Sequence, residues 1–276
     1  MNYILAYDIW GIAHLDENGY PIHYSDNYYL YGKTHIISLI IVILALAAFL
    51  VAFYFLAKKS RKAYKIGIKT FAVWMILFEI GWRVLFLTSA PDFINQDYHW
   101  YPAYACNFTA IMLPIACLTD SKVMKHMFYV FAIVGACLMM LYPSSVFVEP
   151  YITIGAIKSL LQHWNIILIA SADILVGEYK VKFRNYWLGW LGMIVVVINC
   201  TFVTWILYLV GVIPKYGDYL FFNFFGAGTP GYVIIPAIAT VALALIMALS
   251  DRKGFKEFTV KFKEFWKKER ELDKTE

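Results

Sequence analysis

The stretch Tyr101-Pro102-Ala103-Tyr104-Ala105-Cys106-Asn107-Phe108 opens a long apolar run near the middle of the chain. Read as a helix that crosses a membrane, the run carries the thiol of Cys106 and the amide of Asn107 about one turn inside the bilayer surface. Polar residues that are costly at this depth recur in other apolar runs of the chain. The stretch therefore predicts a helix bundle with a polar site close to one membrane surface.

The composition around this stretch is typical of a membrane protein. Of the 276 residues, 61% are hydrophobic and 16% are charged, whereas soluble chains carry about a quarter charged residues. The apolar residues form blocks of about 18 to 24, each long enough to cross a hydrocarbon core of about 30 Å as a helix. These blocks lack the period-two alternation of a membrane β-barrel.

We therefore predict an all-α, polytopic membrane protein with seven transmembrane helices. Basic residues follow the first, fifth and seventh apolar blocks, with a weaker contribution after the third, whereas the N-terminal segment and the loops after the second and fourth are acidic. By the positive-inside rule, the N-terminus lies outside and the C-terminus inside. The start of the chain lacks the basic region of a cleavable signal peptide. The predicted helices span about 34–57, 66–89, 102–118, 123–142, 158–176, 186–211 and 231–249.

Three regions follow from this topology. Residues 1–33 are predicted to form an extracytoplasmic, aromatic-rich surface segment, residues 34–250 the transmembrane bundle, and residues 251–276 a cytoplasmic basic tail. Phenylalanines recur in the tail at three- and four-residue steps among lysines, which predicts an amphipathic helix on an anionic inner leaflet. These phenylalanines are Phe255, Phe258, Phe262 and Phe265.

Polar residues gather in the outer half of the predicted bundle. At 1.5 Å per residue, Cys106 lies roughly 6 Å below the outer end of its span, His163 roughly 8 Å and Arg83 roughly 9 Å. Glu79 is one turn deeper than Arg83, and their i,i+4 spacing predicts a salt bridge. A charge at bilayer depth costs at least about 2.5–3.5 kcal/mol on insertion scales, so these side chains are expected to face one another or a wet cavity.

The predicted outward-facing pocket includes two further asparagines. Asn199 lies near the middle of the sixth span, and Asn223 lies in the loop 212–230, which we expect to cap the bundle from outside. With Glu79 and Arg83 they form the predicted substrate-binding set. A purely structural ion pair is the alternative role for Glu79 and Arg83, because many buried pairs have no catalytic task.

The residue types at this depth favour acyl transfer. A thiol becomes a good nucleophile when an adjacent imidazole takes its proton, which assigns Cys106 as nucleophile and His163 as general base. An amide from Asn107 or Gln162 would donate to the oxyanion of the tetrahedral intermediate. The ester carbonyls of phospholipids lie at the edge of the hydrocarbon region, at the depth predicted for Cys106.

Other kinds of chemistry find no support in the sequence. It contains no P-loop, no dinucleotide fingerprint and no nucleic-acid-binding module, and its cysteines lack the spacing of a zinc site. We expect no metal, no cofactor and no nucleic-acid partner. The expected partners are a phospholipid or acyl-lipid substrate and a bilayer with anionic lipids in its inner leaflet.

Several of these features resemble one known family. They are the seven spans, the Pro-x-x-x-Cys opening from Pro102 to Cys106, the block Leu160-Leu161-Gln162-His163-Trp164, and an aromatic loop with Gly and Pro before the last span. Over roughly residues 34–250 the sequence is similar to the eukaryotic transmembrane protein 164 acyltransferases and their bacterial relatives of the YwaF type.

The resemblance implies an activity and two site residues. It implies transfer of fatty acyl chains between phospholipids through a cysteine thioester with a histidine partner, and by position these residues fall on Cys106 and His163. Bacterial members often have His or Leu just before the cysteine, whereas Tyr104 and Ala105 stand there in this chain.

Three function hypotheses follow. The leading one is a membrane-embedded lipid acyltransferase, or a hydrolase with the same Cys–His chemistry, in a multi-pass protein of the cell membrane. The first alternative is a transporter or binding protein for a small solute or lipid headgroup, which would use Glu79, Arg83 and Asn199 and for which Cys106 would be incidental. The second is a non-catalytic assembly subunit that docks through its aromatic N-terminal segment.

Overall fold

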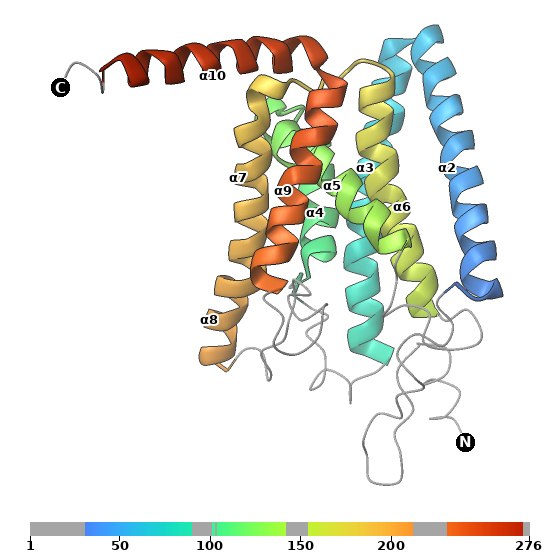
Figure 1. Cartoon of the computed structure of the whole chain (residues 1–276). Coiled ribbons are helices and arrows are strands. Elements are labelled where there is room, and N and C mark those ends of the chain that lie inside the picture. Colours follow the sequence, from blue (N-terminus) through green and yellow to red (C-terminus); the bar gives the residue numbers. More distant parts are fainter. Residues whose placement is uncertain (1–30, 90–100, 103, 142–153, 212–230, 273–276) are drawn as a thin grey trace.

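A computed structural model describes residues 31–89, 101–102, 104–141, 154–211 and 231–272. Within these ranges the chain is helical and contains no strand, as predicted for an all-α protein. Figure 1 shows helices that run side by side along one direction, with α10 lying across one end of the bundle. The helices are α2 (Lys33–Lys59), α3 (Arg61–Ser89), α4 (Ala105–Leu118), α5 (Lys122–Leu141), α6 (Ile154–Leu175), α7 (Tyr186–Ile198), α8 (Thr204–Leu209), α9 (Gly231–Ser250) and α10 (Arg252–Leu272).

Most helix ends agree with the predicted spans to within a few residues. Helix α3 begins at Arg61 rather than near residue 66, because the basic residues after Ser60 continue the helix beyond its apolar part. Helix α4 begins at Ala105 rather than at Pro102, since Tyr104 before it has an extended backbone. Helix α6 begins at Ile154 rather than near residue 158, so its first turn precedes the predicted span.

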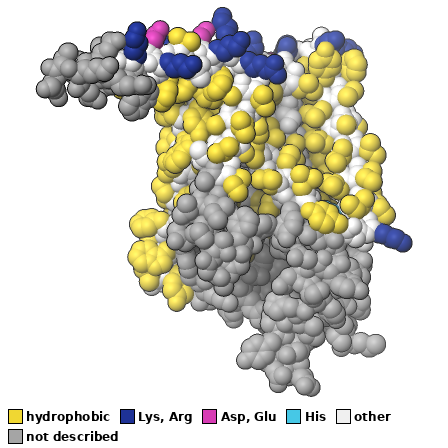
Figure 2. All heavy atoms as spheres, in the orientation of Figure 1, with side chains coloured by type: hydrophobic (Ala, Val, Ile, Leu, Met, Phe, Trp, Pro, Cys, Tyr) yellow, Lys and Arg dark blue, Asp and Glu magenta, His cyan; other side chains and the backbone are white. Residues whose placement is uncertain are grey.

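The surface of the bundle suits a bilayer. Three helical stretches of the described chain are long and apolar enough to cross a membrane, namely Lys33–Lys59, Lys122–Leu141 and Phe183–Leu209. On α2, large apolar side chains are exposed, among them Leu44 and Phe55, as expected for a surface that faces lipid rather than water. On the face shown in Figure 2, hydrophobic side chains cover much of the described surface, and most of the visible Lys and Arg side chains gather at the end that carries α10.

Helix α6 is the central element of the bundle. Every residue from Gln162 to Ala170 is buried, and the helix contacts α2, α3, α4 and α5. Trp164 packs edge-on against Phe49 of α2, with ring centroids 5.1 Å apart, and against Phe71 of α3 at 5.8 Å. A polar side chain on α6 is therefore enclosed by protein over most of the helix length.

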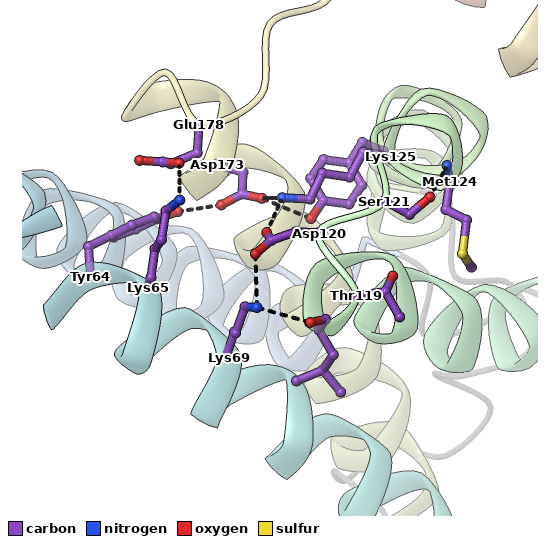
Figure 3. Close-up of polar contacts among 12 residues, drawn as sticks. Tyr64, Lys65, Lys69, Thr119, Asp120, Ser121, Met124, Lys125, Asp173 and Glu178 are labelled. Carbon is purple, nitrogen blue, oxygen red and sulfur yellow. Dashed lines mark hydrogen bonds and ion pairs between the residues drawn. The ribbon is translucent and has the colours of Figure 1, made fainter. Parts of the chain in front are cut away.

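A buried carboxylate joins three helices at the α10 end. Asp173 of α6 is 2% exposed and accepts hydrogen bonds from the hydroxyls of Tyr64 on α3, at 2.8 Å, and Tyr129 on α5, at 2.9 Å. Lys125 of α5 pairs with it at 2.8 Å (Figure 3). Because the buried charge is both paired and hydrogen-bonded, it fixes the relative position of these helices there.

Two close contacts position the later helices. Gly192 of α7 lies against α5 so closely that an added Cβ would stand 2.1 Å from the Met127 carbonyl oxygen. Asp251 separates α9 from α10, where its carboxylate accepts hydrogen bonds from the backbone N–H groups of Gly254, at 3.0 Å, and Phe183, at 2.9 Å. The first contact holds α7 against α5, and the second joins the start of α10 to the segment before α7.

Candidate functional site

Cys106 and His163 line the same cavity. Cys106 lies in the first turn of α4, and His163 comes from the buried part of α6. The cavity has a volume of about 100 Å³ and is enclosed by α4, α5 and α6. Its other walls are apolar or small side chains, namely Ala105, Thr109, Phe131, Ala132, Gly135, Ala136, Met139 and Ile166. The arrangement places a thiol and an imidazole at the edge of a space suited to hydrocarbon.

The hydrogen bonds of His163 determine which ring nitrogen is free. Its Nδ1 lies 2.7 Å from the backbone carbonyl oxygen of Ser159. A carbonyl can only accept, so this contact assigns the proton of a neutral imidazole to Nδ1 and leaves a lone pair on Nε2. His163 is 3% exposed, and Nε2 has no hydrogen-bond partner among the described residues. The free nitrogen can therefore accept a proton.

The Cys106 thiol makes a long contact with its neighbour. Its Sγ lies 3.9 Å from the Asn107 Oδ1 and donates to it. The same oxygen accepts hydrogen bonds from the Gln162 side-chain nitrogen, at 2.9 Å, and the Lys158 ammonium, at 3.3 Å. Asn107 thus connects the thiol to two side chains of α6, and one of the two N–H groups of the Gln162 amide donates to it.

The predicted salt bridge between Glu79 and Arg83 is confirmed. Their side chains lie 2.9 Å apart, and Glu79 is 1% exposed. Lys158 approaches the same carboxylate at 3.6 Å. One oxygen of Glu79 and the Nε of Arg83 are buried without a partner among the described residues, so both can still bond to a ligand or to water.

Lys158 is a site residue that the sequence analysis did not identify. Besides Glu79 and Asn107, it donates to the side-chain oxygen of Gln162. Its side chain is only 11% exposed, and it lies near the start of α6, at the end of the bundle opposite to the one where most of the described basic residues gather. Its i,i+4 spacing from Gln162 was the available signal. With Arg83 it provides two cations to one carboxylate, and this net positive charge favours an oxyanion that forms beside it.

The hydrogen bonds of Asn199 go to the segment before α4 rather than to Glu79 or Arg83. Asn199 begins a π-helical turn, Asn199–Val203, between α7 and α8. Its side-chain oxygen accepts from the Tyr101 hydroxyl at 2.7 Å, and its nitrogen donates to the Pro102 carbonyl at 2.9 Å. Asn199 therefore holds the segment that leads into α4, and so positions Cys106 indirectly. Asn223, the remaining predicted residue, lies outside the described residues.

One comparison with known proteins found a match. A family model described as the TMEM164 family matches residues 30–250, a range that runs from just before α2 to the end of α9. No curated protein and no solved structure matches the chain. The matched range includes all the residues that line the Cys106–His163 cavity, together with Glu79, Arg83 and Lys158.

Proposed function

The chain belongs to the TMEM164 family, and from this premise we propose that it is a membrane-embedded lipid acyltransferase with Cys106 as nucleophile and His163 as general base. One observation carries the proposal. The Nε2 of His163, which has no hydrogen-bond partner within the described ranges, and the thiol of Cys106 belong to side chains that line one apolar cavity. A base with a free lone pair, a thiol and a space for hydrocarbon are the parts that acyl transfer from a lipid requires.

The proposed topology has seven spans in a multi-pass protein of the cell membrane. The spans are α2, α3, α4, α5, α6, the α7–α8 pair and α9, with the N-terminus outside and the C-terminus inside. Residues 1–33 would lie on the outer surface, residues 34–250 would form the bundle, and residues 251–276 would lie on the inner leaflet. The basic residues at the α10 end and the amphipathic sequence of α10 support this orientation.

In the proposed reaction, His163 moves one proton between sulfur and oxygen. The thiol rotates from Asn107 toward the Nε2 of His163 and gives up its proton, while Sγ bonds to an ester carbonyl carbon of a phospholipid. The tetrahedral intermediate collapses, its C–O ester bond breaks, and His163 returns the proton to the leaving lysolipid alkoxide. A second lipid alcohol, or water, then attacks the thioester, gives its proton to His163 and releases the Cys106 thiolate, which regains the proton.

The charged cluster would stabilise the anions formed on this path. Lys158 and Arg83 together exceed the charge of Glu79 by one, and preorganised charge of this kind stabilises an oxyanion most strongly in a site that excludes water. Lys158 contacts Asn107, the neighbour of Cys106, so it is a further candidate for the oxyanion donor beside Asn107 and Gln162. Arg83 would bind the phosphate of the substrate headgroup, which its planar fork suits.

The test is an acyl adduct on Cys106. Purified protein incubated with a phospholipid bearing a labelled acyl chain should acquire a hydroxylamine-sensitive label, and Cys106→Ser should lose that label. His163→Ala should lower the rate of transfer by about 10²–10⁴-fold, the usual contribution of a general base. Cys137→Ser is the matched control, because Cys137 is also half-buried but lies outside the cavity. Wild-type transfer rates in Cys106→Ser and His163→Ala would refute the proposal.

A binding or transport protein is the second candidate. One oxygen of Glu79 and the Nε of Arg83 have no partner in the part of the chain that the structure describes, and a buried charged cluster with such free hydrogen-bonding atoms suits a polar solute. Uptake into vesicles that survives Cys106→Ala and is lost in Arg83→Ala would support this function over acyl transfer.

A further inference from the structure

A second cavity lies at the opposite end of the bundle from Cys106. It has a volume of about 380 Å³ and is formed by the first part of α3, the connection between α4 and α5, the start of α5 and the segment after α6. Because α4 has 14 residues, its two ends lie roughly 20 Å apart. The cavity is therefore separate from the proposed acyl-transfer site. It is lined by Lys65, Asp120, Lys122, Lys125, His126, Gly177, Glu178, Tyr179, Lys180 and Lys182.

Two of the lysines that line this cavity are paired with acidic side chains of the cavity wall. Lys65 pairs with Glu178 at 3.1 Å, and Lys125 pairs with Asp120 at 3.2 Å (Figure 3). Asp120 is also held by Lys69 of α3, at 2.8 Å. Burial would raise the pKa of Asp120, but the hydrogen bonds from Lys69 and Lys125 outweigh it and hold that pKa below its usual value. Asp120 is consequently charged at neutral pH, and the carboxylates of Asp120 and Glu178 both pair with lysines of this end of the bundle.

Three lysines of the wall remain without an acidic partner among the described residues. They are Lys122 at the start of α5, and Lys180 and Lys182 in the segment after α6. All three side chains are exposed and line the cavity. Repulsion among like charges that share one concave surface is costly, and a bound anion removes that cost.

The segment that carries Lys180 and Lys182 is fixed at both ends. Tyr179 is buried, its hydroxyl lies 2.8 Å from the Nδ1 of His126, and its N–H donates to the Asp173 carbonyl at 3.0 Å. On the other side, Phe183 is buried and its N–H donates to Asp251. Two exposed lysines between two anchored aromatic residues are held in place before any ligand arrives, which reduces the entropy lost on binding.

We propose that this lysine-lined cavity binds a phosphate group. Lysine ammonium groups are common phosphate ligands and need no particular orientation of the phosphate. The position of the cavity at the α10 end, where basic residues gather, allows the phosphate to come from a lipid headgroup or from a soluble phosphate ester. The proposal is independent of acyl transfer, because it uses none of the residues around Cys106.

The experiment measures binding of two phosphate sources to the full chain in detergent. Native mass spectrometry would follow retention of phosphatidylglycerol, with phosphatidylcholine as the neutral comparison, and sn-glycerol 3-phosphate would be titrated as the soluble source. The variant Lys180→Gln/Lys182→Gln removes two cavity charges that have no acidic partner in the described part of the chain. The control Lys59→Gln/Lys62→Gln removes the same charge from the end of α2 and the start of α3, outside the cavity and outside α10.

The expected result is selective loss in the cavity variant. Its binding of whichever phosphate source the wild type retains should weaken about tenfold or more, as expected when two lysines beside an anionic group are removed, while the control should change less than threefold. Binding of the lipid alone identifies a headgroup, and binding of glycerol phosphate alone identifies a soluble ester. Binding of neither, or an equal loss in both variants, overturns the proposal. Acyl transfer should be unchanged in both variants, so a failure here leaves the proposed function untouched.

Discussion

At the scale of single residues, the candidate site depends on the carboxylate of Glu79. It is almost fully buried and carries Arg83 and Lys158 as partners. Removing the carboxylate leaves two cations in a region that excludes water, whereas removing one cation leaves a neutral pair. The cluster is thus asymmetric in how it responds to substitution.

This asymmetry gives a prediction for two single variants. Lys158→Met should fold, because Arg83 still neutralises Glu79, but its acyl transfer should fall by about 10²-fold since an electrostatic stabiliser of the oxyanion is gone. Glu79→Gln should be destabilised by about 3–5 kcal/mol, the usual cost of unpairing buried charges. Thermal unfolding in detergent and the labelled-lipid assay check the two variants.

The controls separate charge from packing. Lys158→Arg keeps the charge and should retain most of the transfer rate that Lys158→Met loses. Equal stability of Glu79→Gln and Lys158→Met would contradict the assigned pairing.

The sequence predicts how deep the site residues lie in the bundle, but it does not predict the direction in which their side chains point. Counting 1.5 Å per residue placed Cys106 and His163 at one level, and both line one cavity. The same count could not reveal that Asn199 turns toward Tyr101, because the direction of a side chain depends on how neighbouring helices pack. Lys158 was missed for a related reason, since only the fold shows that it is covered by α3 and α4.

At the scale of helices, two glycines have opposite roles. Gly135 of α5 lines the proposed acyl cavity, and a Cβ there would meet nothing within 4 Å. Gly192 of α7 lies against the Met127 carbonyl, which cannot move without displacing α5. One glycine leaves space open, and the other permits two helices to touch.

A matched pair of alanine substitutions tests this difference. Gly135→Ala should stabilise the protein by up to about 1 kcal/mol, because alanine favours a helix over glycine and no clash opposes it. Gly192→Ala should destabilise it by about 1–3 kcal/mol through overpacking. Thermal unfolding of both variants against wild type is the measurement.

A larger substitution extends the test to function. Gly135→Leu should fill the cavity and reduce transfer of long acyl chains more than short ones. An equal loss of transfer for short and long acyl chains would mean that the cavity does not bind the acyl chain.

Helix ends were predicted well where apolar and polar runs meet sharply. The ends of α2 and α5 lie within two residues of the predicted bounds. The predicted start of α3 is too late, because a helix continues into polar sequence when nothing stops it, and hydropathy detects only its apolar part. The predicted start of α6 is also too late, although its first turn, Ile154-Gly155-Ala156-Ile157, contains no charged residue. The π turn within Phe183–Leu209 leaves no mark in hydropathy, since it changes hydrogen bonding without changing composition.

At the scale of the whole molecule, the two ends of the helix bundle differ in charge. The described basic residues are concentrated at the end that carries α10, in line with the positive-inside orientation we propose. The opposite end holds the Cys106–His163 cavity and the Glu79 cluster. A substrate would then reach the proposed catalytic site from the outer leaflet.

Labelling of single cysteines tests this orientation. In a chain whose native cysteines are replaced by serine, Lys58→Cys and Lys256→Cys should react with an impermeant maleimide only after the cells are permeabilised. Asp97→Cys, in the loop between the second and third predicted spans, should react in intact cells. The reverse pattern would invert the topology and place the Cys106 cavity near the inner leaflet.

The π turn at Asn199–Val203 accommodates one residue more than a regular α-helix would. The helix before it is seated by Gly192 against α5, and the helix after it by Leu207 in the cluster around Phe128. Deletion of a single residue there would restore regular α-helical hydrogen bonds and rotate one half of the helix about its axis by about 100° relative to the other half. The number of residues at this turn therefore cannot change, because deletion of even one residue would break the packing of one half of the helix against its neighbours.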